Sequence, residues 1–294
     1  MTQPPTVMPA GGFPSPGYRA PAAERAADWL RQLAVFTLIA TIVLPIGWIV
    51  LTAFKVPRDV YSLDAALWFT PTLENLRTVF QHPWNLGSKI VNSVLIASGT
   101  VALAIPMATM AAYAFSRYDF RFKQAIFLTV IASQFIPAAI VVLPYFLMFK
   151  QLGLLDTRTA LVLINLSIVL PYALWMIKGF IDAVPLEIEE SAQVDGANRA
   201  RVIAEIVVPA ALPGIITAAV FSFTLTWNEF LFALILSKQQ ALTLPIGLIG
   251  FRTDRGDLWE LMAAGGILIT APMFLLSLLV HRQFIGSLTA GSVR

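Results

Sequence analysis

Six long apolar stretches constrain this chain more than any other feature of its sequence. Each is close to the roughly 20 residues that a helix needs to cross the hydrocarbon of a bilayer. None alternates apolar and polar residues as the strands of a membrane barrel do. We therefore expect an all-α integral membrane protein with six transmembrane helices, over Leu33–Phe54, Ile90–Phe115, Ala125–Phe149, Ala160–Ile177, Ala210–Leu236 and Leu261–Val280.

The composition agrees with a membrane protein and narrows its chemistry. Of the 294 residues, 57% are hydrophobic and 13% are charged, whereas charged residues make up about a quarter of a soluble domain. The chain has no cysteine and only two histidines, His82 and His281, so we expect no metal site and no catalytic residues in it. The basic residues that give a net charge of +3 are scattered between apolar stretches, which disfavours a nucleic-acid partner.

The N-terminal residues differ from the rest of the chain. Residues 1–22 contain six prolines and three glycines, a composition that does not support a packed core. We expect residues 1–32 to form a tail, disordered to about residue 22, and residues 33–294 to form the transmembrane domain. A cleaved signal peptide is not expected, because Glu24 and Asp28 precede an apolar stretch that is too long for one.

Charge alone sets the orientation only weakly. With the N-terminus inside, 11 of the 20 lysines and arginines lie on inner segments, a small bias towards the side that positive charge prefers. Each of the six apolar stretches is interrupted by proline, namely at Pro45, Pro106, Pro137, Pro144, Pro171, Pro213 and Pro272. Kinks at these prolines suit a protein that moves, but proline is also common in membrane helices generally.

A polar segment separates the fourth and fifth apolar stretches. It reads Glu190-Ser191-Ala192-Gln193-Val194-Asp195-Gly196 and is followed by Ile206-Val207-Val208-Pro209. A short helix is expected to start at Pro185 and to stop at Gly196, because glycine adopts the left-handed conformation without steric cost. A second helix is expected over Ala197–Val208. An ordinary amphipathic connector would have the same local structure.

The pattern E-[AS]-A-x3-G-x9-I-x-[LV]-P in this segment resembles that of the binding-protein-dependent ATP-binding-cassette importer permeases, specifically the carbohydrate-uptake group. The resemblance covers Leu33 to Arg294 and includes four runs outside the pattern: Thr72-Leu73-Glu74-Asn75, Asn92-Ser93, Thr226-Trp227-Asn228-Glu229-Phe230-Leu231-Phe232-Ala233-Leu234 and Thr243-Leu244-Pro245-Ile246-Gly247. The C-terminal Gly286–Val293 also resembles the family's tail, with mild departures at Ser287 and Ser292.

The resemblance implies a cytoplasmic coupling helix between spans four and five, which docks into a cleft of an ATPase subunit. The coupling residues it implies are Glu190, Ser191, Ala192, Asp195, Gly196, Ile206 and Pro209. It also implies several partners: a second permease, separate or an identical copy, two ATPase subunits and an extracytoplasmic solute-binding protein. The chain has no G-x4-G-K-[ST] motif, so ATP and magnesium are expected on the ATPases. The expected location is a bacterial or archaeal cytoplasmic membrane, with both termini cytoplasmic.

The function implied is import of a sugar, oligosaccharide or polyol by alternating access. Polar and aromatic side chains within the spans are candidates to contact the solute or, alternatively, to pack between helices: Gln134, Asn165, Tyr172, Trp175, Asn228 and Glu229. A permease for amino acids, peptides or phosphate is the alternative. A secondary transporter is less favoured, because charge within the spans is almost absent apart from Glu229.

Overall fold

The computed structural model describes residues 22–254 and 256–290, and the side chains of 26, 28–254 and 256–278. The chain divides into two units, residues 1–49 and 50–294, which are described separately. The tail expected before residue 22 and the side chains of the tail motif over 286–293 lie outside the described part.

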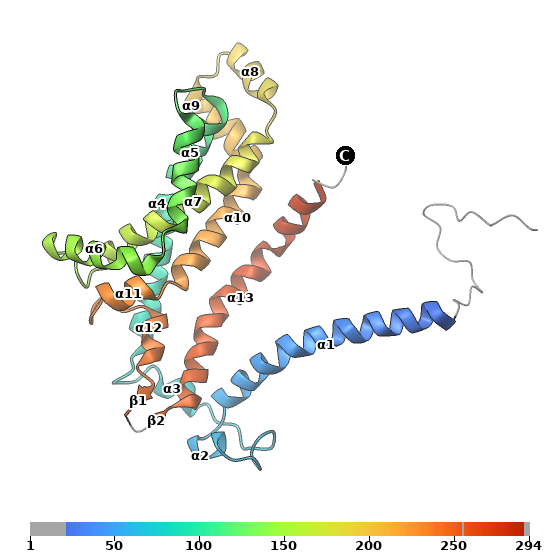
Figure 1. Cartoon of the computed structure of the whole chain (residues 1–294), viewed down its shortest axis with the longest axis vertical. Coiled ribbons are helices and arrows are strands. Elements are labelled where there is room, and N and C mark those ends of the chain that lie inside the picture. Colours follow the sequence, from blue (N-terminus) through green and yellow to red (C-terminus); the bar gives the residue numbers. More distant parts are fainter. Residues whose placement is uncertain (1–21, 255, 291–294) are drawn as a thin grey trace, which may run out of the picture. The chain divides into compact units, whose positions relative to one another are not determined.

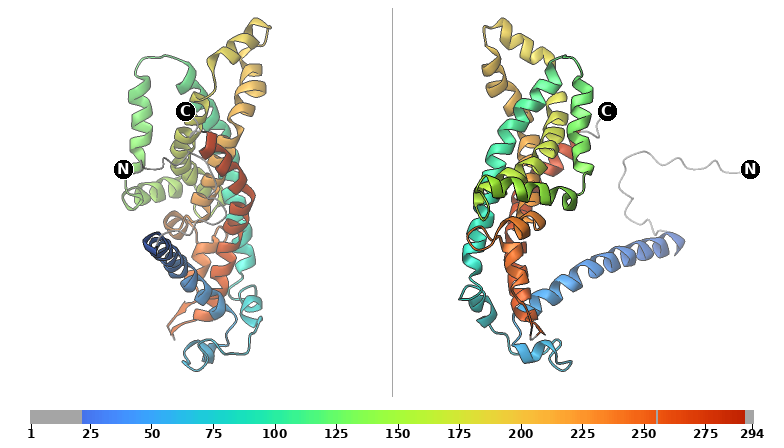
Figure 2. Two further views of the ribbon diagram at one scale, coloured as in Figure 1. Left: turned by 90° about the vertical axis from the view of Figure 1, so that its right-hand side faces the viewer. Right: turned by 60° about the vertical axis from the view of Figure 1, so that its left-hand side comes forward.

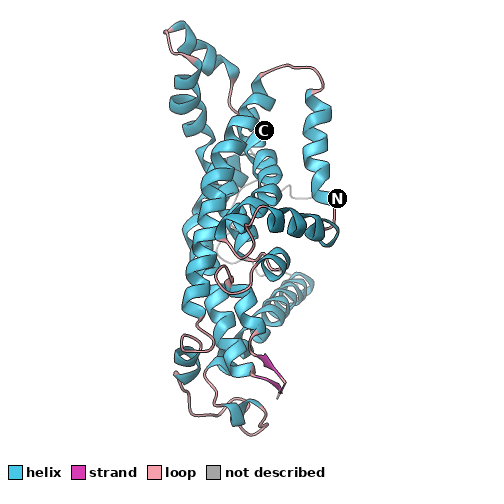
Figure 3. Ribbon diagram, turned by 90° about the vertical axis from the view of Figure 1, so that its left-hand side faces the viewer, coloured by secondary structure: helices cyan, strands magenta, loops and turns pink. Residues whose placement is uncertain are grey.

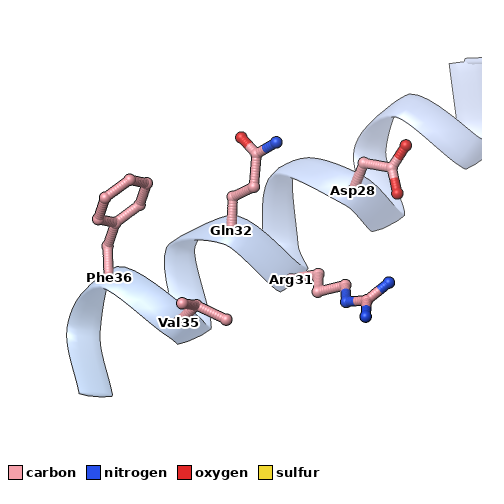
Figure 4. A pocket seen from close by; sticks show the side chains of 5 residues that line it. All are labelled: Asp28, Arg31, Gln32, Val35 and Phe36. Carbon is pink, nitrogen blue, oxygen red and sulfur yellow. The ribbon is translucent and has the colours of Figure 1, made fainter. Parts of the chain in front are cut away.

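The described part of the first unit belongs to helix α1, Ala22–Ala53, which continues into the second unit. Its apolar side chains are largely exposed, for example Phe36 at 67% and Leu44 at 70%. Figure 4 shows where its character changes, from polar Asp28, Arg31 and Gln32 to apolar Val35 and Phe36. A shallow hollow beside these residues is lined by α1 alone. The candidate membrane span within α1 runs from Asp28 to Ala53.

The second unit is built around three long helices that pack side by side (Figure 1): α4, Leu86–Arg117; α7, Arg158–Asp182; and α10, Val208–Trp227. Small residues let them approach closely, among them Ala108, Ala173 and Ala218, which are fully buried. A fourth long helix, α13, Trp259–Ala290, packs against α10. There the indole of Trp227 donates a hydrogen bond to the Ile269 carbonyl at 3.1 Å.

The third apolar stretch is not one helix, contrary to the expectation for Ala125–Phe149. It forms α5, Lys123–Ala132, a 3-10 turn, η1, Ser133–Phe135, and α6, Ala138–Gln151, and the two halves meet at 96° (Figure 2, right). Pro137 explains the break, because the residue before a proline is driven out of the helical conformation. Ile136 is extended there, with ψ of 118°.

The fifth apolar stretch, Ala210–Leu236, is also broken. Helix α10 ends at Trp227, and a short helix, α11, Leu231–Leu236, follows it. Glu229 starts α11, since its carboxylate accepts the backbone amides of Phe232 at 2.7 Å and Ala233 at 3.0 Å. The described residues thus contain five helices long and apolar enough to cross a membrane, or six if α5 and α6 form one broken span.

Short elements gather at one end of the second unit. They are α2, Pro57–Val60, α3, Glu74–Thr78, α12, Leu244–Ile249, and a hairpin of β1, Arg252–Thr253, and β2, Gly256–Asp257, drawn in magenta in Figure 3. Asn75 fastens α3 to the end of α1. Its amide donates to the Ala53 carbonyl at 2.9 Å and to the Lys55 carbonyl at 2.7 Å, which satisfies carbonyls that a helix end leaves unpaired.

Candidate functional site

The polar motif forms a helix, a turn and a second helix at the end of the second unit opposite the hairpin (Figure 1). The first helix is α8, Leu186–Val194, and Pro185 is its N-cap rather than its first residue. Glu187 and Glu189 lie in its first turn, where negative charge is favoured by the helix dipole. The expected short helix is therefore present over almost the predicted range.

A Schellman motif ends α8 at the expected glycine. Gly196 has φ of 89°, and its amide bonds to the Gln193 carbonyl at 3.0 Å. The next amide, of Ala197, bonds back to the Ala192 carbonyl at 3.0 Å. These two bonds define the motif, and they require a left-handed residue at position 196. The turn is therefore a backbone feature that glycine makes possible.

The second helix of the motif differs from the expectation of Ala197–Val208. Helix α9, Arg199–Val202, begins after Asn198, whose side chain accepts the Arg201 amide at 2.9 Å. It runs through a π-helical turn, η2, Ile203–Val207, directly into α10. Proline at 209 cannot donate the amide bond of a regular helix, and a π turn directly before it accommodates the irregularity. Pro209 thus lies inside a continuous helix.

Most of the predicted coupling residues are on the surface. Glu190, Ser191, Asp195, Gly196 and Pro209 are exposed, whereas Ala192 and Ile206 are half-buried. The Ser191 hydroxyl donates to the Glu187 carbonyl within α8. Apolar side chains beside them are exposed as well, with Leu186 at 49%, Ile188 at 51% and Val194 at 88%. A protruding surface with both carboxylates and apolar side chains is suited to a protein partner.

Sequence reasoning missed the residues that hold α8 to the bundle. Glu189 is buried, and Arg117 donates to its carboxylate at 2.7 Å as an ion pair. The hydroxyl of Tyr113 donates to the other carboxylate oxygen at 3.1 Å. The helical period gave one signal, since Glu189 shares a face with Ala192 while Glu190 lies on another. Sequence alone did not identify the arginine, which comes from α4.

The six candidate solute residues do not form one cluster. Tyr172 on α7 lies edge-on to Phe221 of α10, with ring centroids 6.2 Å apart, and Trp175, on the same helix, is 60% exposed. Gln134 is half-buried in η1. Asn228 is exposed at the end of α10, where its amide donates to the Thr224 carbonyl.

Two of the candidates already form hydrogen bonds with backbone groups near them in the chain. Asn165 is 3% exposed, and its amide donates to the Leu161 carbonyl at 2.8 Å. The carboxylate of Glu229 is bonded to the amides that start α11. Over the ranges that the structure describes, no group of three or more acidic or histidine side chains gathers as a metal site requires.

A second polar cluster lies at the other end of the three long helices. Asp156, in a left-handed conformation with φ of 59°, accepts the backbone amides of residues 238–241 at 2.9–3.1 Å. The Asn92 amide donates to the carbonyls of Gln240 at 2.8 Å and Leu242 at 2.9 Å. Ser93 accepts the Leu244 amide at 2.8 Å. The irregular segment after α11 is thus fastened to α4 and to the start of α7.

The charge of Asp156 strengthens this attachment. Burial alone raises the pKa of its carboxyl, but the hydrogen bonds from residues 238–241 outweigh burial and hold the pKa below its ordinary value. Because the pKa of this carboxyl is lower in the folded state than in the unfolded chain, the ionised carboxylate stabilises the folded state at pH values above its ordinary pKa. That stabilisation is lost as the pH falls through the folded-state value.

We expect Asp156→Asn to loosen residues 238–241, because a neutral amide accepts weaker hydrogen bonds than a carboxylate. Their backbone amides should exchange with deuterium about tenfold faster or more, which corresponds to about 1.4 kcal/mol. In the native chain the same amides should exchange faster, relative to intrinsic rates, as the pH falls through the pKa of Asp156. Asp254→Asn, at an exposed position in the hairpin, is the control. Unchanged exchange in Asp156→Asn contradicts the prediction.

Comparisons with known proteins point to the same family as the sequence pattern of the motif. The family model described as "Binding-protein-dependent transport system inner membrane component" matches residues 104–285. The "Trehalose transport system permease protein SugB" of Mycobacterium tuberculosis is 30% identical over 276 residues, which cover 92% of this chain and 99% of that protein. The "Diacetylchitobiose uptake system permease protein DasC" of Streptomyces coelicolor is 30% identical over 271 residues, 90% and 96% of the two chains.

The fold also matches a solved structure. A chain of a bacterial ABC transporter involved in the import of the acidic polysaccharide alginate superposes with a TM-score of 0.75. The match covers 90% of this chain and 99% of that one at 16% identity, so it speaks for the fold alone.

Proposed function

Because this chain belongs to the family of binding-protein-dependent transport system inner membrane components, we propose that it is a membrane-spanning subunit of an ATP-driven importer for a sugar, oligosaccharide or related polyol. The relatives named for trehalose and diacetylchitobiose support a carbohydrate as solute. Both cover at least nine-tenths of this chain, so the likeness extends well beyond the motif.

The observation that carries the proposal is the exposed surface formed by α8 and the Gly196 turn. In our proposal α8 is the coupling helix and docks on a separate ATPase subunit. Its exposed apolar side chains and the carboxylate of Glu190 support a protein partner. In the same proposal α8 and both termini are on the cytoplasmic side of a bacterial or archaeal cytoplasmic membrane, and the chain has six spans, α5 and α6 together forming one of them.

The partners follow from the same assignment. Two ATPase subunits would bind ATP and magnesium, and a second permease subunit would complete the pathway. A solute-binding protein would deliver the solute on the hairpin side. In support, a structurally similar alginate transporter has been solved in complex with an alginate pentasaccharide-bound periplasmic protein, with a TM-score of 0.64 at 19% identity.

The proposed solute contacts narrow to Gln134, Tyr172, Trp175 and Asn228. Asn165 is less suited because it is only 3% exposed, whereas Asn228 is exposed. Glu229 is less suited because both of its carboxylate oxygens accept the amides at the start of α11. Tyr172 and Trp175 are three residues apart on α7 and so occupy neighbouring positions on one face. Aromatic side chains with a polar tip can stack on the apolar C–H face of a sugar ring and bond its hydroxyls.

Glu190→Lys tests the docking surface. We expect the variant to lose the ATPase subunit on purification of the complex, or to lose solute-stimulated ATP hydrolysis, because it reverses an exposed charge at the centre of the proposed contact. Reversal of this charge should weaken the complex roughly tenfold to a hundredfold, which corresponds to about 1.4–2.7 kcal/mol.

Glu74→Lys is the matched control, because Glu74 is an exposed acidic residue in α3, at the other end of the unit. It should keep its ATPase subunit. Failure of the wild-type chain to co-purify with any ATPase subunit would refute the proposed function itself. Equal retention in wild type and Glu190→Lys would remove Glu190 from the contact.

A further inference from the structure

The buried side of α8 is attached to the bundle through one carboxylate. The side chain of Glu189 is 1% exposed and that of Arg117 is 12% exposed. Arg117 Nε donates to one carboxylate oxygen at 2.7 Å, and the Tyr113 hydroxyl donates to the other at 3.1 Å. Both oxygens of Glu189 are therefore bonded to side chains of α4, so α8 and α4 are joined by a charged contact shielded from water.

The same arginine extends the attachment to α7. Its Nη2 atom donates to the carbonyls of Ile181 at 3.0 Å and Val184 at 2.7 Å, at the end of α7. Its Nη1 atom donates to the Ser116 hydroxyl, which in turn donates to Asp182 at 2.6 Å. One guanidinium thus binds three elements together. It holds α8 through the Glu189 carboxylate, the end of α7 and the link after it through the Ile181 and Val184 carbonyls, and α4 through its own backbone.

This arrangement resists separation of the three elements. Pulling α8 from α4 would break the largely buried ion pair of Glu189 with Arg117 and the hydrogen bond from Tyr113, which is strongly unfavourable. Pulling α4 from α7 would instead leave the Ile181 and Val184 carbonyls without the guanidinium that binds them. A force on α8 therefore moves α4 and α7 together with it more readily than it breaks the contact.

We propose that Glu189 and Arg117 form the rigid joint that transmits displacement of α8 to α4 and α7. The inference rests on the proposed function, in which a separate ATPase moves α8. Two adjacent carboxylates then have different tasks. Glu190 faces outward to the partner, and Glu189 faces inward to the helices that move. Glu189 and Arg117 are positioning residues, since neither needs to touch the solute or the nucleotide.

The test is Glu189→Gln in the assembled complex, reconstituted in proteoliposomes with its binding protein and solute. Glutamine keeps the shape of the side chain and loses its charge. We expect the ATPase subunits to stay bound and ATP hydrolysis to continue, while the solute imported per ATP falls about tenfold or more. A merely structural role would lower the yield of complex and scale both rates together, which leaves this ratio unchanged.

The matched control is Asp119→Asn, which neutralises the carboxylate of an exposed ion pair with Lys123, just after α4. Its import per ATP should equal that of wild type. Arg117→Lys is the second variant and decides the question if Glu189→Gln fails to assemble. Lysine keeps the charge, but its single ammonium cannot bond the Glu189 carboxylate together with the Ile181 and Val184 carbonyls in the geometry of a guanidinium. Import per ATP should therefore fall in this variant too.

If an assembled Glu189→Gln complex imports as much solute per ATP as the wild type, the proposed role of Glu189 and Arg117 is wrong. If only Arg117→Lys assembles, a wild-type value of this ratio has the same meaning. Failure of the proposed function has a different signature, because no ATPase subunit would then co-purify with the wild-type chain. The two failures are thus distinguished before any variant is measured.

Discussion

Gly196→Val is expected to abolish solute uptake while the chain still inserts in the membrane. The glycine has φ of 89°, a conformation that costs a β-branched residue roughly 1–2 kcal/mol or more. Relief of that strain would break the two backbone bonds that close the turn, Gly196 to Gln193 and Ala197 to Ala192. Helix α8 would then present the wrong surface to its partner. Uptake and solute-stimulated ATP hydrolysis of the reconstituted complex are the measurements.

Gly196→Asn distinguishes the effect of backbone strain from the effect of adding a side chain at this position. A Cβ atom built at Gly196 meets nothing within 4 Å, so no side chain is excluded by its size. Asparagine enters the left-handed region at a much smaller cost than valine. We expect Gly196→Asn to retain most of the uptake. Equal loss in both variants would mean that the turn conformation is not what the position requires, and normal uptake in Gly196→Val would remove the turn from the coupling mechanism.

Local signals in the sequence predicted local structure well. The turn at Gly196 and the short acidic helix before it are confirmed, because a helix end is determined by a few neighbouring residues. The expected spans over Ile90–Phe115 and Ala160–Ile177 also lie within single helices. Apolar length predicts that a segment can cross a membrane, and these two segments do form unbroken helices.

Hydropathy failed where helix direction changes inside an apolar stretch. Counting apolar residues does not detect the 96° bend at Pro137 or the start of a new helix after Glu229. In the sequence Pro137 predicts only a kink, and Glu229 a possible solute contact. In the structure Pro137 is the N-cap of α6, and Glu229 accepts the amides at the start of α11.

Polar contacts between distant segments could not be predicted from one sequence. Glu189 and Arg117 are 72 residues apart, and Asp156 binds amides that lie 82–85 residues further along the chain. Each contact joins segments that are brought together only by the packing of the three long helices. The motif Asn92-Ser93 was recognised by resemblance, and its physical role, bonding residues 240–244, emerged only with the fold.

The close packing of α7 and α10 makes a strong prediction at Gly214, where Gly214→Ala should severely destabilise the protein. A Cβ atom there would lie 2.0 Å from Cγ of Phe180 and 2.2 Å from its Cδ2. Because Cγ is only one bond from the Cβ of Phe180, the ring cannot move aside without leaving its rotamer. Overpacking of this kind costs about 1–3 kcal/mol and occasionally more. The measurement is the fraction of detergent-solubilised protein that stays monodisperse after heating.

Two further variants, Gly179→Ala and Gly214→Ala combined with Phe180→Ala, test whether the clash with Phe180 causes the loss of stability. Gly179 is next to Phe180, but a Cβ atom there meets nothing within 4 Å. Its replacement by alanine in a helix should therefore be neutral or stabilising by up to about 1 kcal/mol. Gly214→Ala combined with Phe180→Ala should recover part of the lost stability, because the ring that clashes is gone while a cavity remains. If Gly214→Ala is as stable as Gly179→Ala, α7 and α10 are not in close contact at this position.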